Sequence, residues 1–327
     1  MNSSLDLPVN GLTQPEYTEN SSAVHAALEF SALSLVGPVR SENQDTVYFP
    51  GIDRDGSFGA TPVEASSSKV PIHSALSFSE IPPVQNLFAI ADGMGGYSHG
   101  KLASLLAVET LNRSLVALDH SSPIHKSLRR SIEAANTRVF QASQAIAAGH
   151  MGTTLTAALI EGNQLVVGHV GDSRVYLVRD GKSTCLSSDH TSVGDLVRMK
   201  VLTADKIRSH SQRSILTRAI GLSLFVQPDI GIHKIQPGDR LILCSDGVWA
   251  VIEDDEFGQI CSETKDVEHL SEKLINIALD RETDDNVSVV SVEVHSTRGL
   301  TSTTPSPTPK TSFLRRLFRR KKLENTA

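Results

Sequence analysis

The 327-residue sequence has few cysteines, no long apolar run and no basic start followed by an apolar segment. Its three cysteines, Cys185, Cys244 and Cys261, show no CxxC spacing, so we expect neither a disulfide framework nor a zinc site. No stretch approaches the roughly 18 to 20 apolar residues that a membrane-spanning helix needs. Residues 1–20 also lack the features of a secretory signal. These absences favour a protein of the reducing cytosol.

Charge is distributed unevenly along the chain, although the formal net charge is only −6. From Arg298 to the last residue there are eight Lys or Arg and one acid, whereas the remaining residues carry 23 basic and 36 acidic side chains. A strongly acidic body argues against nucleic-acid binding. It suits a protein that gathers carboxylates around cations.

Composition divides the chain into four segments. Residues 1–29 are polar and predict a flexible N-terminal arm. Residues 30–296 predict a single domain, which carries a Gly-, Ser- and Pro-rich loop or hairpin insert at 50–86. A Ser/Thr/Pro linker follows at 297–311, and a basic amphipathic tail occupies 312–327.

Strand and helix patterns occur in separate blocks within the predicted domain. Strands are expected at 30–35, 87–91, 153–160, 164–170, 174–179, 240–244 and 287–294, and helices at 100–119, from 122 onward, at 190–222 and at 264–280. Blocks of this kind favour an α+β layered domain over strict βαβ alternation.

Four aspartates lie beside predicted strands. Asp92 and Asp246 each follow an apolar strand and precede a glycine, while Asp45 and Asp285 lie beside further strands. Mg²⁺ and Mn²⁺ prefer such carboxylate ligands, and several carboxylates at one sheet edge repel each other without a cation. Each Asp-Gly pair taken singly is typical of a turn. The pattern alone therefore leaves open a set of turns or a metal site.

Six short motifs occur in order along the chain. They are Arg40-Ser-Glu-Asn-Gln-Asp45, Ala91-Asp-Gly-Met-Gly-Gly96, Met151-Gly-Thr-Thr154, Val170-Gly-Asp-Ser-Arg174, Ser245-Asp-Gly247 and Asp284-Asp-Asn286. Together they resemble the type 2C, metal-dependent (PPM) family of serine/threonine protein phosphatases in its compact bacterial form. The resemblance covers residues 31–294 and implies a four-layer α-β-β-α sandwich with two central antiparallel sheets flanked by helices.

The resemblance also implies a role for each motif residue. Asp92 would bridge two Mn²⁺ or Mg²⁺ ions and, with Asp246 and Asp285, form the catalytic set. Asp172 would hold a third ion, and Arg40 would grip the substrate phosphate with its fork of donors. The implied ligands of the two-metal site are Asp45, Asp92, Gly93, Asp246 and Asp285.

The implied reaction is hydrolysis of phosphoserine and phosphothreonine in proteins by a metal-activated water, which reverses kinase signalling. Three positions depart from the family pattern. Gln44 stands where many members have Glu, and Lys101 stands where an acid is common. Met94 occupies the place of a histidine that serves as general acid in some eukaryotic members, so we assign no general acid.

Two alternatives remain open at this point. The first is a regulatory phosphoprotein-binding module on the same fold with weak or no activity. Retention of all five motif aspartates argues against it. The second is a membrane adaptor led by the tail, which leaves the aspartate motifs unexplained.

The tail at 312–327 places four apolar side chains on one face of a potential helix, with arginines between them. Such a segment could bind an anionic membrane surface weakly or dock on an acidic partner. A solvated, disordered end and a tail that folds back onto the acidic body are the alternatives. Otherwise we expect a cytoplasmic monomer whose partners are phosphoprotein substrates and a cognate kinase. The four apolar positions on the face of the potential tail helix are Phe313, Leu314, Leu317 and Phe318.

Overall fold

The computed structural model describes residues 28–49, 84, 86–95, 99–118, 122–145 and 151–297. Most of the expected arm, nearly all of the 50–86 insert, the basic tail and all but the first residue of the linker lie outside the described residues.

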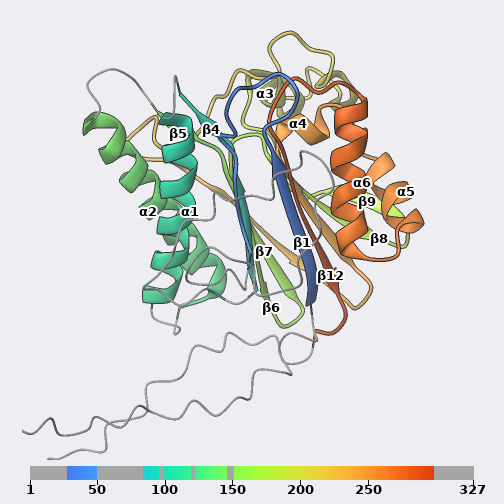
Figure 1. Ribbon diagram of the computed structural model, residues 1–327. Coiled ribbons are helices and arrows are strands. Elements are labelled where there is room, and N and C mark those ends of the chain that lie inside the picture. The colour runs from blue at the N-terminus through green and yellow to red at the C-terminus, as the bar shows by residue number, and fades with distance from the viewer. Residues whose placement is uncertain are drawn as a thin grey trace, which may run out of the picture.

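Two antiparallel sheets form the centre of the molecule (Figure 1). A small third sheet pairs β4 (Gly93–Met94) with β5 (Gly152–Thr153). In the first large sheet the order is β1 (Leu28–Leu35), β12 (Val287–Val294), β11 (Arg240–Cys244), β8 (Arg174–Arg179) and β9 (Lys182–Cys185). In the second it is β10 (Asp229–Lys234), β7 (Gln164–Val170), β6 (Leu155–Glu161), β3 (Leu87–Ala91) and β2 (Thr46–Tyr48).

Helices cover the outer face of each sheet (Figure 1). Helices α1 (His99–Ala117) and α2 (Ile124–Ala145) pack on the second sheet through a core that includes Leu111 and Ile132. The first sheet is covered by α4 (Asp246–Trp249), α5 (Glu256–Glu263) and α6 (Val267–Asp280). Between the sheets lies a third core of apolar side chains. The expected α-β-β-α sandwich is therefore confirmed.

Pairing between β1 and β12 moves the start of the domain. Leu28 is buried and pairs with Val294, and the ladder continues to Leu35 opposite Val287. Strand β1 therefore begins two residues before the strand start expected at residue 30. Burial of Leu28 against the inter-sheet core explains the shift, because that apolar contact stabilises the end of the strand.

The predicted helix at 190–222 is wrong over most of its length. Helix α3 spans only Ser192–Arg198, and a single 3₁₀ turn follows at Ala204–Lys206. Beyond it the chain makes tight turns, and Arg208 donates hydrogen bonds to the carbonyl oxygens of Trp249 and Ile252. These tertiary contacts fix a non-helical path for the segment 199–220, which we call the flap segment.

Several short elements were not expected from the sequence. Strands β2, β9 and β10 are edge or near-edge strands with few residues or with polar faces, and α5 has only eight residues. Their weak periodicity explains the omission, since partners elsewhere in the chain stabilise them. Among the described residues, no helix is long and apolar enough to cross a membrane.

Candidate metal centre

One end of the sandwich collects the aspartate motifs. In the first sheet, β11 runs antiparallel to β12 and β8, so Cys244 lies beside Val289 and Arg174. Residues after β11, before β12 and before β8 therefore meet at one edge. In the second sheet, the same end carries the residues after β3, before β2 and after β7. The aspartates brought to this end are Asp45, Asp92, Asp172, Asp246 and Asp285.

Asp45 is fully buried at the start of β2. Its Oδ2 accepts hydrogen bonds from Ser245 Oγ at 2.9 Å and from Ser288 Oγ at 2.5 Å, whereas its Oδ1 has no partner. Lys101 Nζ donates to the Asp45 carbonyl oxygen at 2.5 Å. The side chain is thus oriented by one oxygen, which leaves the other available for a ligand.

Asp92 and Gly93 form the turn between β3 and β4. The Asp92 amide donates to Thr154 Oγ1 at 2.8 Å, and its carbonyl accepts from Thr154 N and Thr153 Oγ1, both at 2.8 Å. A side chain at Gly93 would meet the Gly100 carbonyl oxygen at 2.0 Å. Only glycine fits this packing, which presses the turn against α1.

Asp246 and Asp172 lie at the same end of the adjacent strands β11 and β8 of the first sheet. Asp246 is the first residue of α4 and follows Ser245 at the N-cap position, and its buried Oδ1 has no hydrogen-bond partner. Asp172 lies in the β7–β8 turn and is 5% exposed. Trp249 Nε1 donates to the Asp172 carbonyl oxygen at 2.8 Å, which ties this turn to α4.

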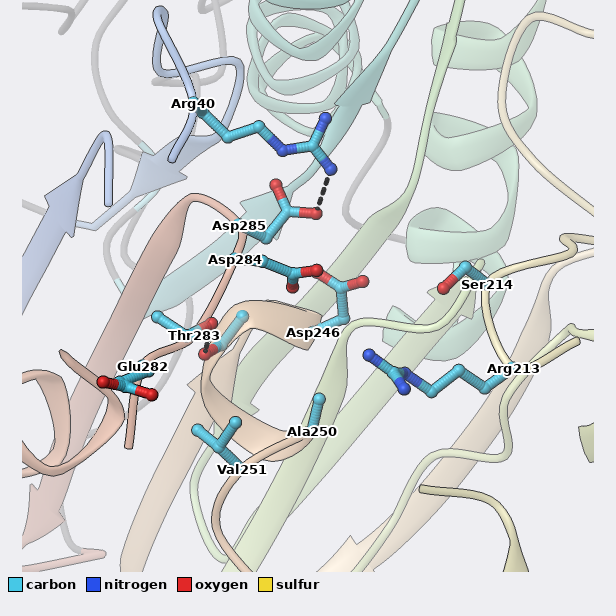
Figure 2. A pocket seen from close by; sticks show the side chains of 11 residues that line it. Arg40, Arg213, Ser214, Asp246, Ala250, Val251, Glu282, Thr283, Asp284 and Asp285 are labelled. Atoms are coloured by element: carbon cyan, nitrogen blue, oxygen red, sulfur yellow. Dashed lines mark hydrogen bonds and ion pairs between the residues drawn. The ribbon is translucent and has the colours of Figure 1, made fainter. Parts of the chain in front are cut away.

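Arg40 lies over the site and pairs with one of the aspartates. Its guanidinium donates to Asp285 Oδ2 at 2.6 Å, as the dashed line in Figure 2 shows. The neighbouring Asn286 clamps the Arg40 loop, because its side chain donates to the Val36 and Glu42 carbonyl oxygens and accepts from the Gln44 amide. Residues 245 positions apart are thereby held in contact.

Electrostatics at this end disfavour the ionised carboxylates. Desolvation raises the pKa of Asp45 to about 6. The hydrogen bonds from Ser288 and Ser245 act against this shift, and the charge of Asp285 adds to it. Desolvation and then the charges of Asp285 and Asp45 raise the pKa of Asp246 to about 7. The pKa values of Asp92 and Asp172 also lie well above the usual range, chiefly because of desolvation and then neighbouring aspartates. A bound cation would remove this penalty.

A cavity of about 310 Å³ opens beside these aspartates. Figure 2 shows Arg40 above it and Arg213 and Ser214 on the flap side, with Asp246 between them. On the remaining side the loop after α6 contributes Glu282, Thr283, Asp284 and Asp285. The cavity thus joins anion-binding arginines to a carboxylate cluster.

The structure adds residues that motif analysis did not assign to the site. Arg213, Ser214 and Asp284 line the cavity, and Trp249 anchors the Asp172 turn. The flap arginine could have been suspected from its basic segment, but no sequence spacing places it opposite Arg40. Within the described part of the chain, no group of three or more His, Cys, Asp or Glu side chains is already arranged to hold a metal ion.

The chain resembles known proteins in sequence and in fold. A family profile described as protein phosphatase 2C matches residues 72–287. A Streptococcus pyogenes serotype M6 protein named as protein phosphatase 2C-type is 35% identical over 212 residues, which cover 64% of this chain and 86% of that protein.

Two solved structures share the fold. The crystal structure of the Mycobacterium tuberculosis serine/threonine phosphatase PstP matches with a TM-score of 0.66 and 31% identity, covering 82% of this chain and 99% of the other. A PstP catalytic domain in complex with two manganese ions matches with a TM-score of 0.64 and 30% identity, covering 83% and 99%. The chain therefore belongs to the protein phosphatase 2C family.

Proposed function

We propose that the aspartate end of the sandwich is a two-metal centre at which the chain hydrolyses phosphoserine and phosphothreonine in proteins. One observation carries the proposal: buried carboxylates gather there without enough internal cations, and Oδ1 of Asp45 and of Asp246 has no hydrogen-bond partner. Buried polar atoms are almost always satisfied in folded proteins. Of these two residues Asp246 lines the cavity and Asp45 is fully buried, and such orphan carboxylate oxygens are well suited to a hard divalent cation.

The donor set fits Mn²⁺ or Mg²⁺, since all the side-chain ligands are oxygens. In our assignment Asp45, Asp92, the Gly93 carbonyl, Asp246 and Asp285 would hold two ions, with Asp92 shared between them. Asp172, on the β7–β8 turn, would hold a third ion. The PstP catalytic domain that matches this fold holds two manganese ions, which supports the same stoichiometry here.

Arg40 has two roles in this assignment. Its guanidinium pairs with Asp285 in the structure. A cation held by Asp285 would compete for that carboxylate, and the Arg40 donors would then be available to the oxygens of a substrate phosphate. Divalent ions at such a centre lower the pKa of bound water and neutralise phosphate charge. The chain itself supplies positioning: the Asn286 clamp fixes the Arg40 loop, and Trp249 fixes the Asp172 turn.

Hydrolysis of p-nitrophenyl phosphate and of a phosphothreonine peptide tests the proposal, each in Mn²⁺, in Mg²⁺ and in EDTA. We expect turnover with either metal and none in EDTA. Activity that survives EDTA would contradict the metal mechanism. Metal binding by calorimetry without turnover of either substrate would instead favour the regulatory phosphoprotein-binding module.

The relatives' names imply phosphoprotein substrates and kinase signalling, and we extend this to a cognate serine/threonine kinase, a monomeric enzyme and a cytoplasmic site of action. The tail at 312–327 is proposed to contact anionic membrane surfaces weakly or an acidic partner, on the strength of its basic amphipathic sequence. Liposome sedimentation of the full chain and of a chain ending at residue 311 tests the membrane contact. Equal partitioning of both would contradict it.

A further inference from the structure

The loop that follows α6 carries an unpaired acidic side chain into the wall of the cavity. Glu282 and Asp284 both line the cavity and are exposed to solvent, and neither carboxylate has a hydrogen-bond or ion-pair partner in the described part of the chain. Figure 2 shows the Glu282 carboxylate on the side away from Arg40 and Arg213. The cavity therefore has a basic side and an acidic side.

The one cation of this loop is turned away from the cavity. Arg281 donates to the Val251 carbonyl oxygen at 2.6 Å and makes a two-pronged pair with Glu256, at 2.6 and 2.8 Å. It therefore cannot neutralise Glu282, which follows it directly. Arg281 is therefore engaged elsewhere and leaves the Glu282 carboxylate without an internal counter-charge, whereas Asp284 also interacts electrostatically with Arg40.

Glu282 also occupies a backbone position that favours glycine. Its φ is 57°, and the amides of Glu282 and Thr283 donate to the carbonyl oxygens of Leu279 and Ala278. This is the hydrogen-bond pattern of a Schellman motif, in which the left-handed residue is usually glycine because other side chains are strained there. The fold therefore does not require a glutamate at this position.

We propose that Glu282, assisted by Asp284, selects phosphoprotein substrates that carry a lysine or arginine close to the phosphorylated residue. This inference rests on the proposed phosphatase function of the same cavity. A phosphate brought next to unpaired carboxylates is repelled, and a basic neighbour in the substrate offsets that repulsion by pairing with Glu282. An acidic neighbour adds to it, so the same side chain also rejects acidic sequences. Asp246 also lines this cavity, and its buried Oδ1 has no hydrogen-bond partner, so the proposed reaction site and the Glu282 carboxylate share one cavity.

The test compares phosphothreonine peptides that are identical except for a Lys, Ala or Glu near the phosphothreonine. The ratio of kcat/KM for the Lys peptide to that for the Glu peptide is measured for the Mn²⁺-loaded full chain. We expect a ratio above one that falls as salt is raised, because partly exposed charge pairs are screened. Glu282→Gln should lower the ratio about two- to five-fold, the range for an ion pair at a partly exposed site.

Two further variants separate selectivity from folding. Glu282→Gly should lose the same selectivity while the melting temperature stays equal or rises, because glycine suits the left-handed position. Glu282→Lys should invert the preference. The matched control is Glu268→Gln, which removes one negative charge from an exposed position at the other end of α6 and should leave the ratio unchanged.

The outcomes are distinguishable from failure of the phosphatase assignment. If no peptide is hydrolysed in Mn²⁺, the proposed function itself is wrong. If all peptides are hydrolysed but the wild-type ratio is close to one, or if Glu282→Gln and Glu282→Gly retain the wild-type ratio, the selectivity proposal is overturned and the phosphatase assignment stands.

Discussion

Two clusters of buried charge lie on either side of Trp249, and they are balanced differently. In the first, Arg174 donates to both carboxylate oxygens of Asp189 at 2.9 and 2.7 Å and lies over the Trp249 ring at 3.7 Å from its centroid. Arg208 and Arg174 both pair with Asp254. In the second, the aspartates of the proposed metal centre gather at one end of the sandwich, and two of their oxygens have no partner.

The comparison separates a structural cluster from a functional one. Arg174 and Asp189 satisfy each other, so this pair stabilises a unique packing without any ligand. The aspartate cluster raises its own pKa values by desolvation and repulsion, which marks it as a site that needs cations. The two clusters are connected, because Trp249 packs under Arg174 and donates to the Asp172 carbonyl oxygen. The Arg174–Asp189 cluster, which we call the balanced cluster, thus fixes the backbone at Asp172 in the aspartate cluster, which we call the unbalanced cluster.

The largest effect is expected in the unbalanced cluster. Asp246→Asn should reduce turnover of p-nitrophenyl phosphate in Mn²⁺ by about a thousand-fold or more, equivalent to about 4 kcal/mol, because it removes a ligand charge from the centre. The EDTA-treated variant should fold at least as stably as the EDTA-treated wild type, since a repelling charge is gone. Near-normal turnover would show that Asp246 does not belong to the metal centre.

In the balanced cluster, by contrast, removing a charge should lower the stability of the fold. Arg174→Met leaves Asp189 buried without its counter-ion and should lower the free energy of unfolding by about 3 kcal/mol or more in urea denaturation. Arg113→Met, which breaks an exposed helix-surface pair with Glu109, serves as the control and should cost about 0.5 kcal/mol or less. Equal losses in the two variants would remove the distinction between the clusters.

Arg40 pairs with Asp285 and lines the cavity, so its replacement tests whether it binds the substrate phosphate. Arg40→Ala should raise KM for p-nitrophenyl phosphate about ten-fold with a smaller change in kcat, because the phosphate loses a charged donor. Arg40→Lys should recover part of the loss, since it restores the charge without the fork. Steady-state kinetics in Mn²⁺ check both variants, and unchanged KM and kcat in Arg40→Ala would contradict the assigned role.

The smallest effect concerns pH. Asp45 and Asp246 have folded-state pKa values of about 6 and about 7, above those of an unfolded chain, so the metal-free native state holds extra protons between about pH 4 and 7. Stability of the EDTA-treated protein should therefore fall by about 1 kcal/mol or more as pH rises through this range. Mn²⁺ should stabilise the protein more at pH 8 than at pH 5, because its ligands must be deprotonated.

Melting temperatures at the two pH values, with EDTA and with Mn²⁺, provide the measurement. Asp246→Asn is the control, because it lacks one of the titrating groups and should show a weaker pH dependence in EDTA. If the metal-free wild type and Asp246→Asn had the same melting temperature at both pH values, the pKa of Asp246 would not be raised in the folded protein.

Several features of the fold and site could be predicted from the sequence because they depend on local patterns. Leu87–Ala91 is a continuous apolar run, and Val287–Val294 is rich in valine, so both segments favour buried strands wherever their partners lie. Helix α2 begins at Ile124, one residue beyond the expected first helical position at Pro123, and proline's fixed backbone geometry explains why a helix starts there. The ordered Asp motifs likewise named the aspartates that the fold brings to one end.

Other features were decided only by tertiary structure, because they depend on contacts between distant segments. The flap segment was expected to be helical, yet the contacts of Arg208 with Trp249 and Ile252 hold it in turns. No spacing pairs Arg40 with Asp285, since the two are adjacent only after β1 and β12 align. Glu282 faces the cavity because α6 ends in a left-handed turn at that residue. Sequence thus determined which groups are available, and packing determined which of them are left without a partner.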